Sequence, residues 1–505
     1  MVTLKEMIDV MPTVRSSQGG ADVEVLRLCY SSRDVTPDSG SVFFALKGET
    51  VDGHDYIEQA REAGAIGIVA ESAAPEPGDF PWVQVRDSRE ALAHAAATLQ
   101  GHPSKDLRVA GVTGTNGKTT VAFLLHYLLK RAQHYAGMLG TVHYDVGSEY
   151  RSATHTTPES VEIQSLLTEM RDAGCRSAVM EVSSHALSQH RVDSVLFDAG
   201  IFTNFSQDHL DYHKTMDAYF EAKALLGELL INQGGKKKPV FVINKDDGYG
   251  QRLIRRFKDR VELVTYGMSI GSDFRATRIA ADVNGTRFEL EAKGRTFMVR
   301  LPLIGRYNVY NVMAALAATK AMGLNLRESV QHLEEVPQIP GRLEAIDHIG
   351  GFKVYVDYAH TPDALENVLK LLRDLSPRSL ICVFGCGGNR DREKRKLMGM
   401  ASRTYADVSV VTSDNPRNED PEEIIEDIGK AFGTEYYVKY VDRREAIRRA
   451  IAMALPGDIV VVAGKGHEAE QQFATETVPF DDRDEVFKAL QVLDLNPRRT
   501  GGRPR

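Results

Sequence analysis

The chain contains few cysteines and a single tryptophan. Its 505 residues include 4 cysteines and 1 tryptophan, and Cys29, Cys175, Cys382 and Cys386 are scattered at spacings that match no zinc site. Cys382 and Cys386 lie in or beside a strand-like run, so we interpret them as buried, reduced thiols. This cysteine usage favours a cytoplasmic protein over a secreted, disulfide-bonded one.

Long apolar runs and an excess of positive charge are also missing. No run approaches the length of a transmembrane helix, and the first ten residues lack the apolar core of a signal peptide. With 62 basic and 70 acidic side chains the formal charge is −8, so no global basic field attracts nucleic acid. We therefore expect a cytoplasmic protein with no membrane insertion and no nucleic-acid partner, and the sequence implies no obligate protein partner.

The length suggests about three domains. Short strand-like runs and a helix-like run over 88–99 occupy residues 1–103, and strands alternate with helices over 104–337 and again over 338–505. We predict an α/β fold with an N-terminal α/β domain (1–103), a central domain with a mostly parallel sheet (104–337) and a C-terminal α/β domain (338–505). The apolar strand candidates are 41–46, 65–70, 107–110, 177–182, 197–203, 239–243, 353–356, 379–384, 408–412 and 458–463.

The most informative stretch runs from Gly111 to Thr120 and reads GVTGTNGKTT. It lies between a strand-like run and an amphipathic, helix-like run over 121–129, which is the order strand, glycine-rich loop, helix. Such a loop points backbone N–H groups at phosphates, and the helix N-terminus adds partial positive charge. Lys118 can then reach the outer phosphates, and the hydroxyl of Thr119 or Thr120 can bind Mg²⁺. The stretch predicts an ATP or GTP site rather than an ordinary turn, although its glycine spacing departs from the general P-loop.

Two further clusters in the central segment suit a metal ion near those phosphates. Glu181 ends a strand candidate, and His209 stands in the polar run from Asn204 to His213. A carboxylate at a strand end and an imidazole on the next loop could hold Mg²⁺, and so many polar groups suggest a second substrate. The alternative is that His185, His209 and His213 only cap loops. By composition Lys223 is a helix-surface lysine.

Four polar segments follow strand candidates in the last third of the chain: 357–363, 385–391, 414–417 and 464–468. Ligands of such sheets bind at the carboxyl ends of the strands. The segments mix cations, carboxylates and amides, which suits a small zwitterion bearing both carboxylate and ammonium groups. For Gly385 to Gly388 a tight turn is the alternative, and a second dinucleotide site would need a GxGxxG order that is absent.

These motifs together resemble the Mur ligases, ATP-dependent amide-forming enzymes of peptidoglycan precursor synthesis. The resemblance runs from about Ser32 to Glu468 and implies three domains: an N-terminal UDP-sugar-binding domain, a central P-loop ATPase and a C-terminal Rossmann-like amino-acid domain. The matching runs are GTNGKTT, EVSSH from Glu181, DHLD from Asp208, Asn308 with Asn311, PGR ending at Arg342, and DYAHTP from Asp357.

The resemblance implies roles for residues that match family positions. Ser32, Thr156, Thr157, Ser183, Gln189 and Arg191 would hold a UDP-muramoyl-dipeptide. Gly114, Thr115, Asn116, Gly117, Lys118, Thr119, Thr120, Asn308, Arg342 and Asp357 would bind ATP. Thr119, Glu181, His209 and Lys223, the last as an N6-carboxylysine carbamate, would bind Mg²⁺. Lys118, Lys223, Glu181 and His209 would be catalytic, and Arg390, Asp414, Asn415, Arg417, Gly464 and Glu468 would bind diaminopimelate.

Among Mur ligases the chain resembles those that join meso-diaminopimelate to UDP-N-acetylmuramoyl-L-alanyl-D-glutamate through an acyl-phosphate. Arg417 can pair bidentately with the carboxylate that diaminopimelate has at its far end and lysine lacks. Ser31 departs from the family's aspartate. The alternatives are a sibling ligase that adds L-lysine or acts like folylpolyglutamate synthase, and a P-loop kinase or nucleotide-switched binding protein. The kinase alternative would leave Lys223 and the run from Asp414 to Arg417 without a role.

Overall fold

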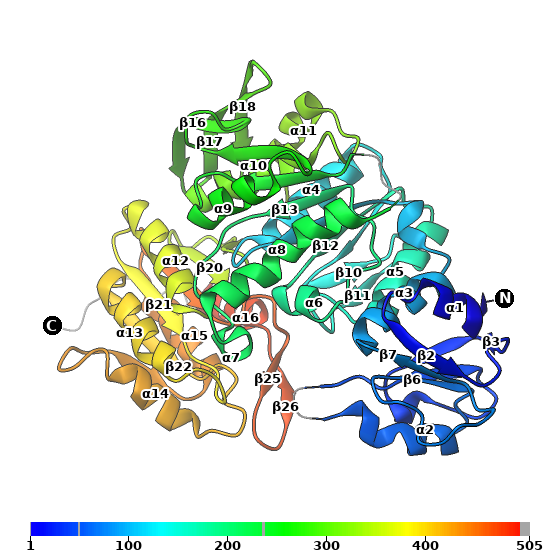
Figure 1. Cartoon of the computed structure of the whole chain (residues 1–505). Coiled ribbons are helices and arrows are strands. Elements are labelled where there is room, and N and C mark those ends of the chain that lie inside the picture. The colour runs from blue at the N-terminus through cyan, green and yellow to red at the C-terminus, as the bar shows by residue number, and fades with distance from the viewer. Residues whose placement is uncertain (1, 49–50, 235–237, 495–505) are drawn as a thin grey trace. The chain divides into compact units, whose positions relative to one another are not determined.

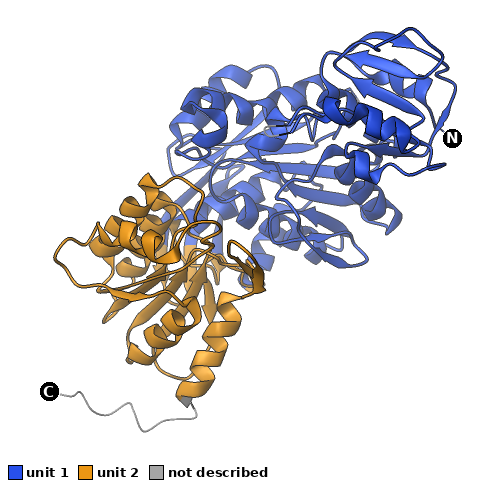
Figure 2. Ribbon diagram, turned by 90° about the horizontal axis from the view of Figure 1, so that it is seen from below, with its two compact units in different colours: residues 1–279, 288–299, 307–334 blue, residues 280–287, 300–306, 335–505 orange. Residues whose placement is uncertain are grey.

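The structure, a computed structural model, describes residues 2–48, 51–234 and 238–494. They form two compact units, which Figure 2 shows in different colours. The first unit comprises the chain up to 279 together with 288–299 and 307–334, and the second comprises 280–287, 300–306 and the chain from 335 onward. The predicted domain boundaries at 103 and 337 stay a prediction.

A five-stranded sheet in the order β2-β7-β6-β5-β4 occupies the N-terminal part of the first unit (Figure 1). All neighbours pair in parallel except β2 with β7. The helix over 88–99 has the predicted limits, because Asp87 caps it by accepting from the backbone N–H groups of Arg89 and Glu90. The elements are β1 (Val2–Thr3), α1 (Leu4–Val10), β2 (Val14–Gln18), β3 (Glu24–Val25), β4 (Arg27–Cys29), β5 (Ser41–Phe44), α2 (Ile57–Glu62), β6 (Gly67–Ala70), β7 (Trp82–Val85) and α3 (Ser88–Leu99).

Residues 108–301 contribute an eleven-stranded sheet in the order β11-β10-β9-β12-β8-β13-β14-β15-β16-β17-β18. From β9 to β16 every neighbouring pair is parallel, which confirms the mostly parallel central sheet. The strands are β8 (Arg108–Thr113), β9 (Ala136–Leu139), β10 (His143–Asp145), β11 (Tyr150–Ser152), β12 (Ser177–Glu181), β13 (Ala199–Phe202), β14 (Val240–Asn244), β15 (Glu262–Gly267), β16 (Phe274–Asp282), β17 (Gly285–Ala292) and β18 (Arg295–Leu301). The helices of this part are α4 (Lys118–Arg131), α5 (Ser160–Asp172), α6 (Ser184–Ser188), α7 (Leu210–His213), α8 (Met216–Asn232), α9 (Gly248–Phe257), α10 (Arg306–Ala318) and α11 (Leu326–His332).

The glycine-rich loop is shorter than the sequence suggested. Strand β8 continues to Thr113, and helix α4 begins at Lys118, so only residues 114–117 form the turn. Gly111 belongs to the strand, where a Cβ would come within 2.7 Å of the Phe197 ring. Gly111 therefore allows close packing against Phe197 and does not contribute to the turn that would contact phosphate.

The second unit has a six-stranded sheet in the order β19-β20-β24-β21-β22-β23, parallel except for β19. One face packs on α12, α13 and α14, and the other on α15 and α16. Both faces are buried, which explains the continuous apolar runs. Its elements are β19 (Glu344–Ile346), β20 (Lys353–Asp357), α12 (Pro362–Asp374), β21 (Leu380–Phe384), α13 (Glu393–Tyr405), β22 (Val408–Thr412), α14 (Pro421–Gly429), β23 (Val438–Tyr440), α15 (Arg443–Met453), β24 (Ile459–Ala463), β25 (Glu470–Gln472), β26 (Thr477–Pro479) and α16 (Asp482–Asp494).

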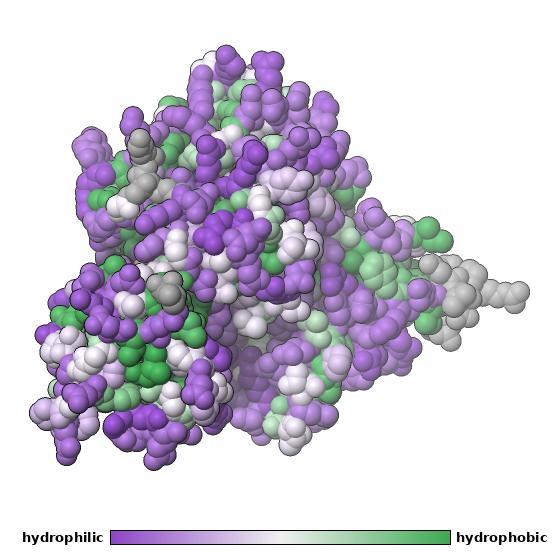
Figure 3. Space-filling model, turned by 90° about the vertical axis from the view of Figure 1, so that its right-hand side faces the viewer, coloured by the Kyte–Doolittle hydropathy of each residue, from purple (hydrophilic) through white to green (hydrophobic). Residues whose placement is uncertain are grey.

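Two expectations from composition concern the cysteines and the surface. All four cysteines are buried free thiols, and burial raises the pKa of Cys382 and Cys386 to about 12. Within the described residues no helix combines the length and apolarity needed to cross a membrane. The face in Figure 3 is mainly hydrophilic, with hydrophobic residues in small separate groups.

Candidate active site

The loop between β8 and α4 is built to approach a ligand with its backbone. Gly114 has φ +142°, and a Cβ there would lie 1.9 Å from the Thr203 hydroxyl oxygen, so this position requires glycine. The Lys118 ammonium donates to the carbonyl oxygens of Gly114 (3.0 Å) and Thr115 (2.9 Å). The loop, the lysine and the N-terminus of α4 thus converge as the sequence predicted for phosphate binding.

Glu181 lies beside this loop because β12 is the parallel neighbour of β8. Its carboxylate is buried, and it accepts from the Thr119 hydroxyl (3.0 Å) and from the backbone N–H of Thr141 (2.8 Å). A carboxylate and a hydroxyl are the oxygen donors that Mg²⁺ prefers, and Mg²⁺ usually completes its shell with water and phosphate oxygens. The described residues contain no cluster of three or more His, Cys, Asp or Glu side chains that could hold a metal alone. Thr119 and Glu181 therefore fit a magnesium ion that a bound nucleotide helps to hold.

Lys223 does not lie on the surface, and the expectation from composition was wrong. Its side chain is 1% exposed on α8, where the ammonium donates to the Gly114 carbonyl oxygen (2.7 Å) and lies 4.5 Å from the Tyr219 ring centre. Burial, with the charge of Lys118 nearby, lowers the pKa of Lys223 well below its usual range. The sequence did contain a signal for the burial of this lysine, because Lys223 is the only basic residue of the apolar helix α8.

The histidines of the polar loop lie together. The His185 ring centre is 4.9 Å from that of His209 and 5.4 Å from that of His213. His213 is buried and shares a 2.9 Å hydrogen bond with the Ser184 hydroxyl, and burial lowers its pKa to about 4. It therefore joins α7 to α6, as the loop-capping alternative proposed. Partial burial lowers the pKa of His209, helped by the charges of Lys118, His185 and Lys223, which favours the neutral imidazole that binds cations.

Five of the six residues predicted to hold the muramoyl-dipeptide meet at the ends of β12 and α6. Thr157 donates to the Glu181 carbonyl oxygen (2.9 Å) and accepts from the Ser183 N–H (3.1 Å). Arg191 donates to the Thr157 carbonyl oxygen (2.8 Å) and to the Gln189 side chain (2.7 Å). Thr156 bonds to the Thr141 hydroxyl (3.1 Å), whereas Ser32 begins a short 3-10 helix after β4 and donates to Gln59 (2.9 Å).

The predicted nucleotide contacts beyond the loop divide between the two units. Asn308 accepts from Asn311 (3.0 Å) on α10, and a Cβ on Gly117 would lie 2.4 Å from the Asn311 amide oxygen, so α10 lies against the loop. In the second unit the Arg342 guanidinium lies 4.8 Å from the Tyr358 ring centre. Asp357 accepts from the backbone N–H groups of Leu343 (2.6 Å) and Ala359 (2.8 Å).

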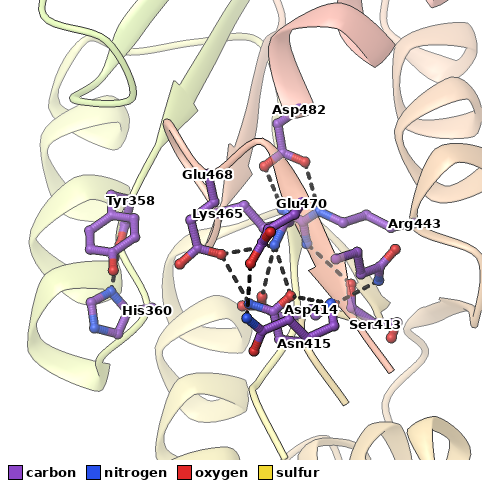
Figure 4. Close-up of polar contacts among 12 residues, drawn as sticks. Tyr358, His360, Ser413, Asp414, Asn415, Arg443, Lys465, Glu468, Glu470 and Asp482 are labelled. Carbon is purple, nitrogen blue, oxygen red and sulfur yellow. Dashed lines mark hydrogen bonds and ion pairs between the residues drawn. The ribbon is translucent and has the colours of Figure 1, made fainter. Parts of the chain in front are cut away.

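The predicted amino-acid contacts cluster at the carboxyl ends of β21, β22 and β24. Asn415 donates to the Glu468 carboxylate (3.0 Å), and Figure 4 shows both beside Asp414. Arg417 donates to the Gly388 carbonyl oxygen (2.9 Å) and has φ +52°. Burial and the nearby charge of Arg390 lower the pKa of Arg417. Gly464 also belongs here, since a Cβ on it would lie 2.9 Å from the Asp414 carboxylate.

Comparison with known proteins agrees with this geometry. Three family models match: Mur ligase family, catalytic domain (26–100), Mur ligase middle domain (112–319) and Mur ligase, glutamate ligase domain (341–466). The UDP-N-acetylmuramoyl-L-alanyl-D-glutamate--2,6-diaminopimelate ligase of Geobacter sulfurreducens is 42% identical over 94% of this chain and 96% of its own length. The enzyme of that name from Geobacillus thermodenitrificans is 44% identical over 95% and 97%.

This chain belongs to the Mur ligase family.

Solved structures agree with the assignment. A structure titled as a UDP-N-acetylmuramoyl-L-alanyl-D-glutamate--2,6-diaminopimelate ligase matches with a TM-score of 0.68 and 31% identity over 98% of this chain and 99% of that one. A Thermotoga maritima MurF ligase in complex with ADP shares the fold, with a TM-score of 0.62, 20% identity, and 94% and 99% coverage. The resemblance and the α/β fold predicted from the sequence are thereby confirmed. Membership of the Mur ligase family also argues against a P-loop kinase.

Three buried charged residues of this Mur ligase were not among the predicted site residues. Lys465 is fully buried between Asn415 and Glu468. The Arg443 guanidinium pairs with Asp482 (2.7 Å) and donates to the carbonyl oxygens of Ser413 (3.4 Å) and Ala463 (3.0 Å). Lys465 could have been found, because it stands between Gly464 and Glu468, whereas no local signal marks Arg443 at the start of α15.

Proposed function

We propose that this chain is an ADP-forming ligase that joins meso-diaminopimelate to UDP-N-acetylmuramoyl-L-alanyl-D-glutamate in peptidoglycan precursor synthesis. The observation that carries the proposal is the polar cluster of Asp414, Asn415, Arg417 and Glu468 at the strand ends of the second unit. It offers cations and carboxylates to a zwitterion, in a chain whose relatives bear the name of this activity. ATP would be the phosphoryl donor, and because ATP is available in the cytoplasm the reaction would take place there.

The chemistry has two steps. The γ-phosphoryl group of ATP passes to the free carboxylate of the nucleotide-linked D-glutamate, giving ADP and an acyl-phosphate. The amine of diaminopimelate attacks the acyl carbon, loses a proton, and phosphate leaves from the tetrahedral intermediate. The attacking carboxylate and the ATP phosphates are both negatively charged and repel each other. Lys118 and the N–H groups of the loop would supply the positive charge that offsets this repulsion. Bound Mg²⁺ would further neutralise the phosphates, held by Thr119, Glu181 and His209.

Lys223 has a separate proposed role as a carbamate. Its amine donates to the Gly114 carbonyl oxygen and lies near the charge of Lys118, and no carboxylate of the described residues is hydrogen-bonded to it. The neutral amine adds to CO₂, releases a proton and becomes an anionic carbamate. That product would face Lys118 with an opposite charge, and it would offer oxygen atoms to a magnesium ion.

The third substrate, the UDP-linked muramoyl-dipeptide, would bind to the first unit. Thr157, Ser183, Gln189 and Arg191 form one hydrogen-bonded surface that ends next to Glu181, and Thr156 precedes Thr157 in the chain. We propose that this surface holds the muramoyl-dipeptide, and that Ser32 contacts the uridine-diphosphate part. A carboxylate bound there would lie at the strand ends that also carry the loop of residues 114–117 between β8 and α4, here called the phosphate loop.

The test is a ligation assay with a panel of amino acids. Purified protein is given MgATP and UDP-N-acetylmuramoyl-L-alanyl-D-glutamate, and ADP release and product mass are measured with each amino acid. We expect turnover only with all three substrates, and a preference for meso-diaminopimelate over L-lysine. Lys118→Ala should remain folded and lose at least about a hundredfold in turnover, because one cation at the phosphoryl group is lost. ADP release without any amino acid, or near-normal turnover of Lys118→Ala, would contradict the proposal.

A further inference from the structure

A buried ammonium group lies beneath the candidate amino-acid site and belongs to none of the predicted contacts. Lys465 is fully buried, and its Nζ donates to Asn415 Oδ1 (3.0 Å) and Glu468 Oε2 (2.9 Å). Asp414 Oδ1 lies 3.9 Å from the same nitrogen. Figure 4 shows the lysine at the centre of these groups, which come from the ends of β22 and β24.

Lys465 determines which side-chain atoms of Asn415 and Glu468 face a ligand in the amino-acid site. Asn415 Oδ1 accepts from Lys465 and from the Gln472 backbone N–H (3.1 Å), so the amide oxygen must face these two donors. The Asn415 amide nitrogen then points at Glu468 Oε2, to which it donates. Glu468 Oε2 thus receives two donors, whereas Oε1 accepts no hydrogen bond from any residue that the structure describes. The carboxylate is 31% exposed and can offer Oε1 to a ligand.

The lysine also sets the charge of the site. Asp414 and Glu468 are negative, and Lys465 is one of three cations here, with Arg417 and the nearby Arg390, so the five groups sum to +1. The far end of meso-diaminopimelate carries one carboxylate and one ammonium and is neutral, whereas the far end of L-lysine carries only an ammonium. Removal of Lys465 would take one positive charge from this sum, which favours a lone ammonium relative to a zwitterion.

We propose that Lys465 is a positioning residue that fixes Asn415 and Glu468 and, through the charge balance, makes the site select a zwitterionic far end over a cationic one. The inference rests on the proposed function and deepens it. Lys465 would act on the ligand through Asn415 and Glu468, because its own ammonium group is buried behind them.

The scaffold around Lys465 does not depend on it. Arg443 holds the carbonyl oxygens of Ser413 and Ala463, the residues at the ends of β22 and β24, and pairs with the fully buried Asp482. These contacts use none of the Lys465 partners. A variant that keeps the volume of the lysine stem should therefore fold.

The experiment compares Lys465→Met with Lys465→Arg, wild type and the exposed control Lys430→Met of the same unit. For each, kcat and KM are measured with meso-diaminopimelate and L-lysine, together with the KM values for ATP and the UDP-linked substrate. Lys465→Met should raise the KM for diaminopimelate about tenfold or more and lower the preference for diaminopimelate over lysine by a similar factor. The KM values for the other substrates should stay within about twofold, and Lys465→Arg should keep part of the preference.

Three results separate the inference from the proposed function. An unchanged preference and an unchanged diaminopimelate KM in Lys465→Met, with wild type preferring diaminopimelate, overturn the inference alone. A wild type that prefers L-lysine overturns the proposed function and the inference together. Circular dichroism of all variants, with calorimetric binding of diaminopimelate to Lys465→Arg, covers the case of a misfolded Lys465→Met. A partial loss of preference in a folded Lys465→Arg, which keeps the charge but changes the geometry of the donors, supports the inference. A preference and a diaminopimelate affinity equal to those of wild type overturn the positioning role.

Discussion

At the scale of single residues, burial decides the chemistry of two ionisable groups. Lys223 carries an amine that is enclosed by an apolar helix and a backbone carbonyl, and Asp357 carries a carboxyl at the end of β20 with two backbone N–H donors. Transfer of a charge from water into such surroundings is costly, so each group favours its neutral form more than it does in solution. Both effects can be measured.

Lys223 should carry a carbamate when CO₂ is kept in the sample. The expected result is an added 44 Da, the mass of CO₂, in intact mass measured under bicarbonate, or the corresponding ¹³C signal from ¹³C-bicarbonate. Lys223→Ala should lose activity by about a hundredfold, with partial rescue by short carboxylic acids, which restore an anion at this position. The exposed Lys214, near the start of α8, provides the control variant Lys214→Ala. A fully active Lys223→Ala would remove this residue from the mechanism.

Asp357 should make the second unit less stable as pH rises. Burial raises its pKa from 3.8 to about 6, although the Arg342 charge and the backbone N–H groups oppose the shift. Between these values the native state keeps a proton that the unfolded state has released, so the contribution is complete below about pH 4 and lost through pH 6. Two pKa units correspond to up to about 3 kcal/mol.

The measurement is denaturant unfolding of wild type and Asp357→Asn from pH 4 to pH 7 without nucleotide. The free energy of unfolding of wild type relative to that of Asp357→Asn should fall as pH rises across this range. The exposed Asp363→Asn is the matched control variant. A difference between wild type and Asp357→Asn that stays constant with pH would show that Asp357 titrates normally.

At the scale of elements, the candidate site depends on the hydrogen bonds that hold the loops after the parallel strands in place. Parallel strands bring their carboxyl ends to one edge, but the loops that follow still need partners for their carbonyl groups. In the second unit Arg443 supplies them from the first turn of α15 to the residues after β22 and at the end of β24. In the first unit Thr157 and Arg191 join the ends of β12 and α6.

Removal of Arg443 should therefore weaken the second unit strongly. Arg443→Met leaves the Asp482 carboxylate buried without its partner, which typically costs about 3–5 kcal/mol. The double variant Arg443→Met/Asp482→Leu should regain part of this loss, since no unpaired charge remains. The measurement is the denaturant midpoint, with Arg449→Met as control, because Arg449 lies on the solvent side of the same helix. Equal midpoints for Arg443→Met and Arg449→Met would contradict this role.

At the scale of the whole molecule, the proposed binding residues separate by unit. Arg390, Asp414, Asn415, Arg417, Gly464 and Glu468 all belong to the second unit, whereas the phosphate loop and the muramoyl-dipeptide surface belong to the first. Each unit has hydrophobic cores of its own. A ligand of one unit can therefore be followed by its effect on that unit.

Diaminopimelate alone should protect only the second unit from hydrogen exchange. At a hundredfold excess over its dissociation constant a ligand stabilises the state it binds by about 2.7 kcal/mol. We expect slower exchange in segments around 385–391, 414–417 and 464–472, and none in 108–131. Mass spectrometry of peptides would show this, and Arg417→Ala should lose the effect. Protection that appears first in the phosphate loop would place diaminopimelate elsewhere.

The sequence by itself determined the apolar, buried strands and the positions of the motifs. Continuous apolar runs such as 379–384 and 408–412 became buried strands, because a strand covered by helices on both faces needs apolar side chains at every position. The order strand, glycine-rich loop, helix predicted the turn between β8 and α4, since that geometry is local. The family motifs fixed the candidate residues for the same reason, as each motif is a short run of neighbours.

Only the tertiary structure decided what surrounds each charge. Lys223 reads as a surface lysine until α8 packs its side chain against the Gly114 carbonyl, which lies 109 residues away in the sequence. Arg443 and Asp482 stand 39 residues apart and become one buried pair only when α15 and α16 cover the same face of the sheet. The free energy of a charge depends on the atoms that replace its water, and long-range packing chooses those atoms.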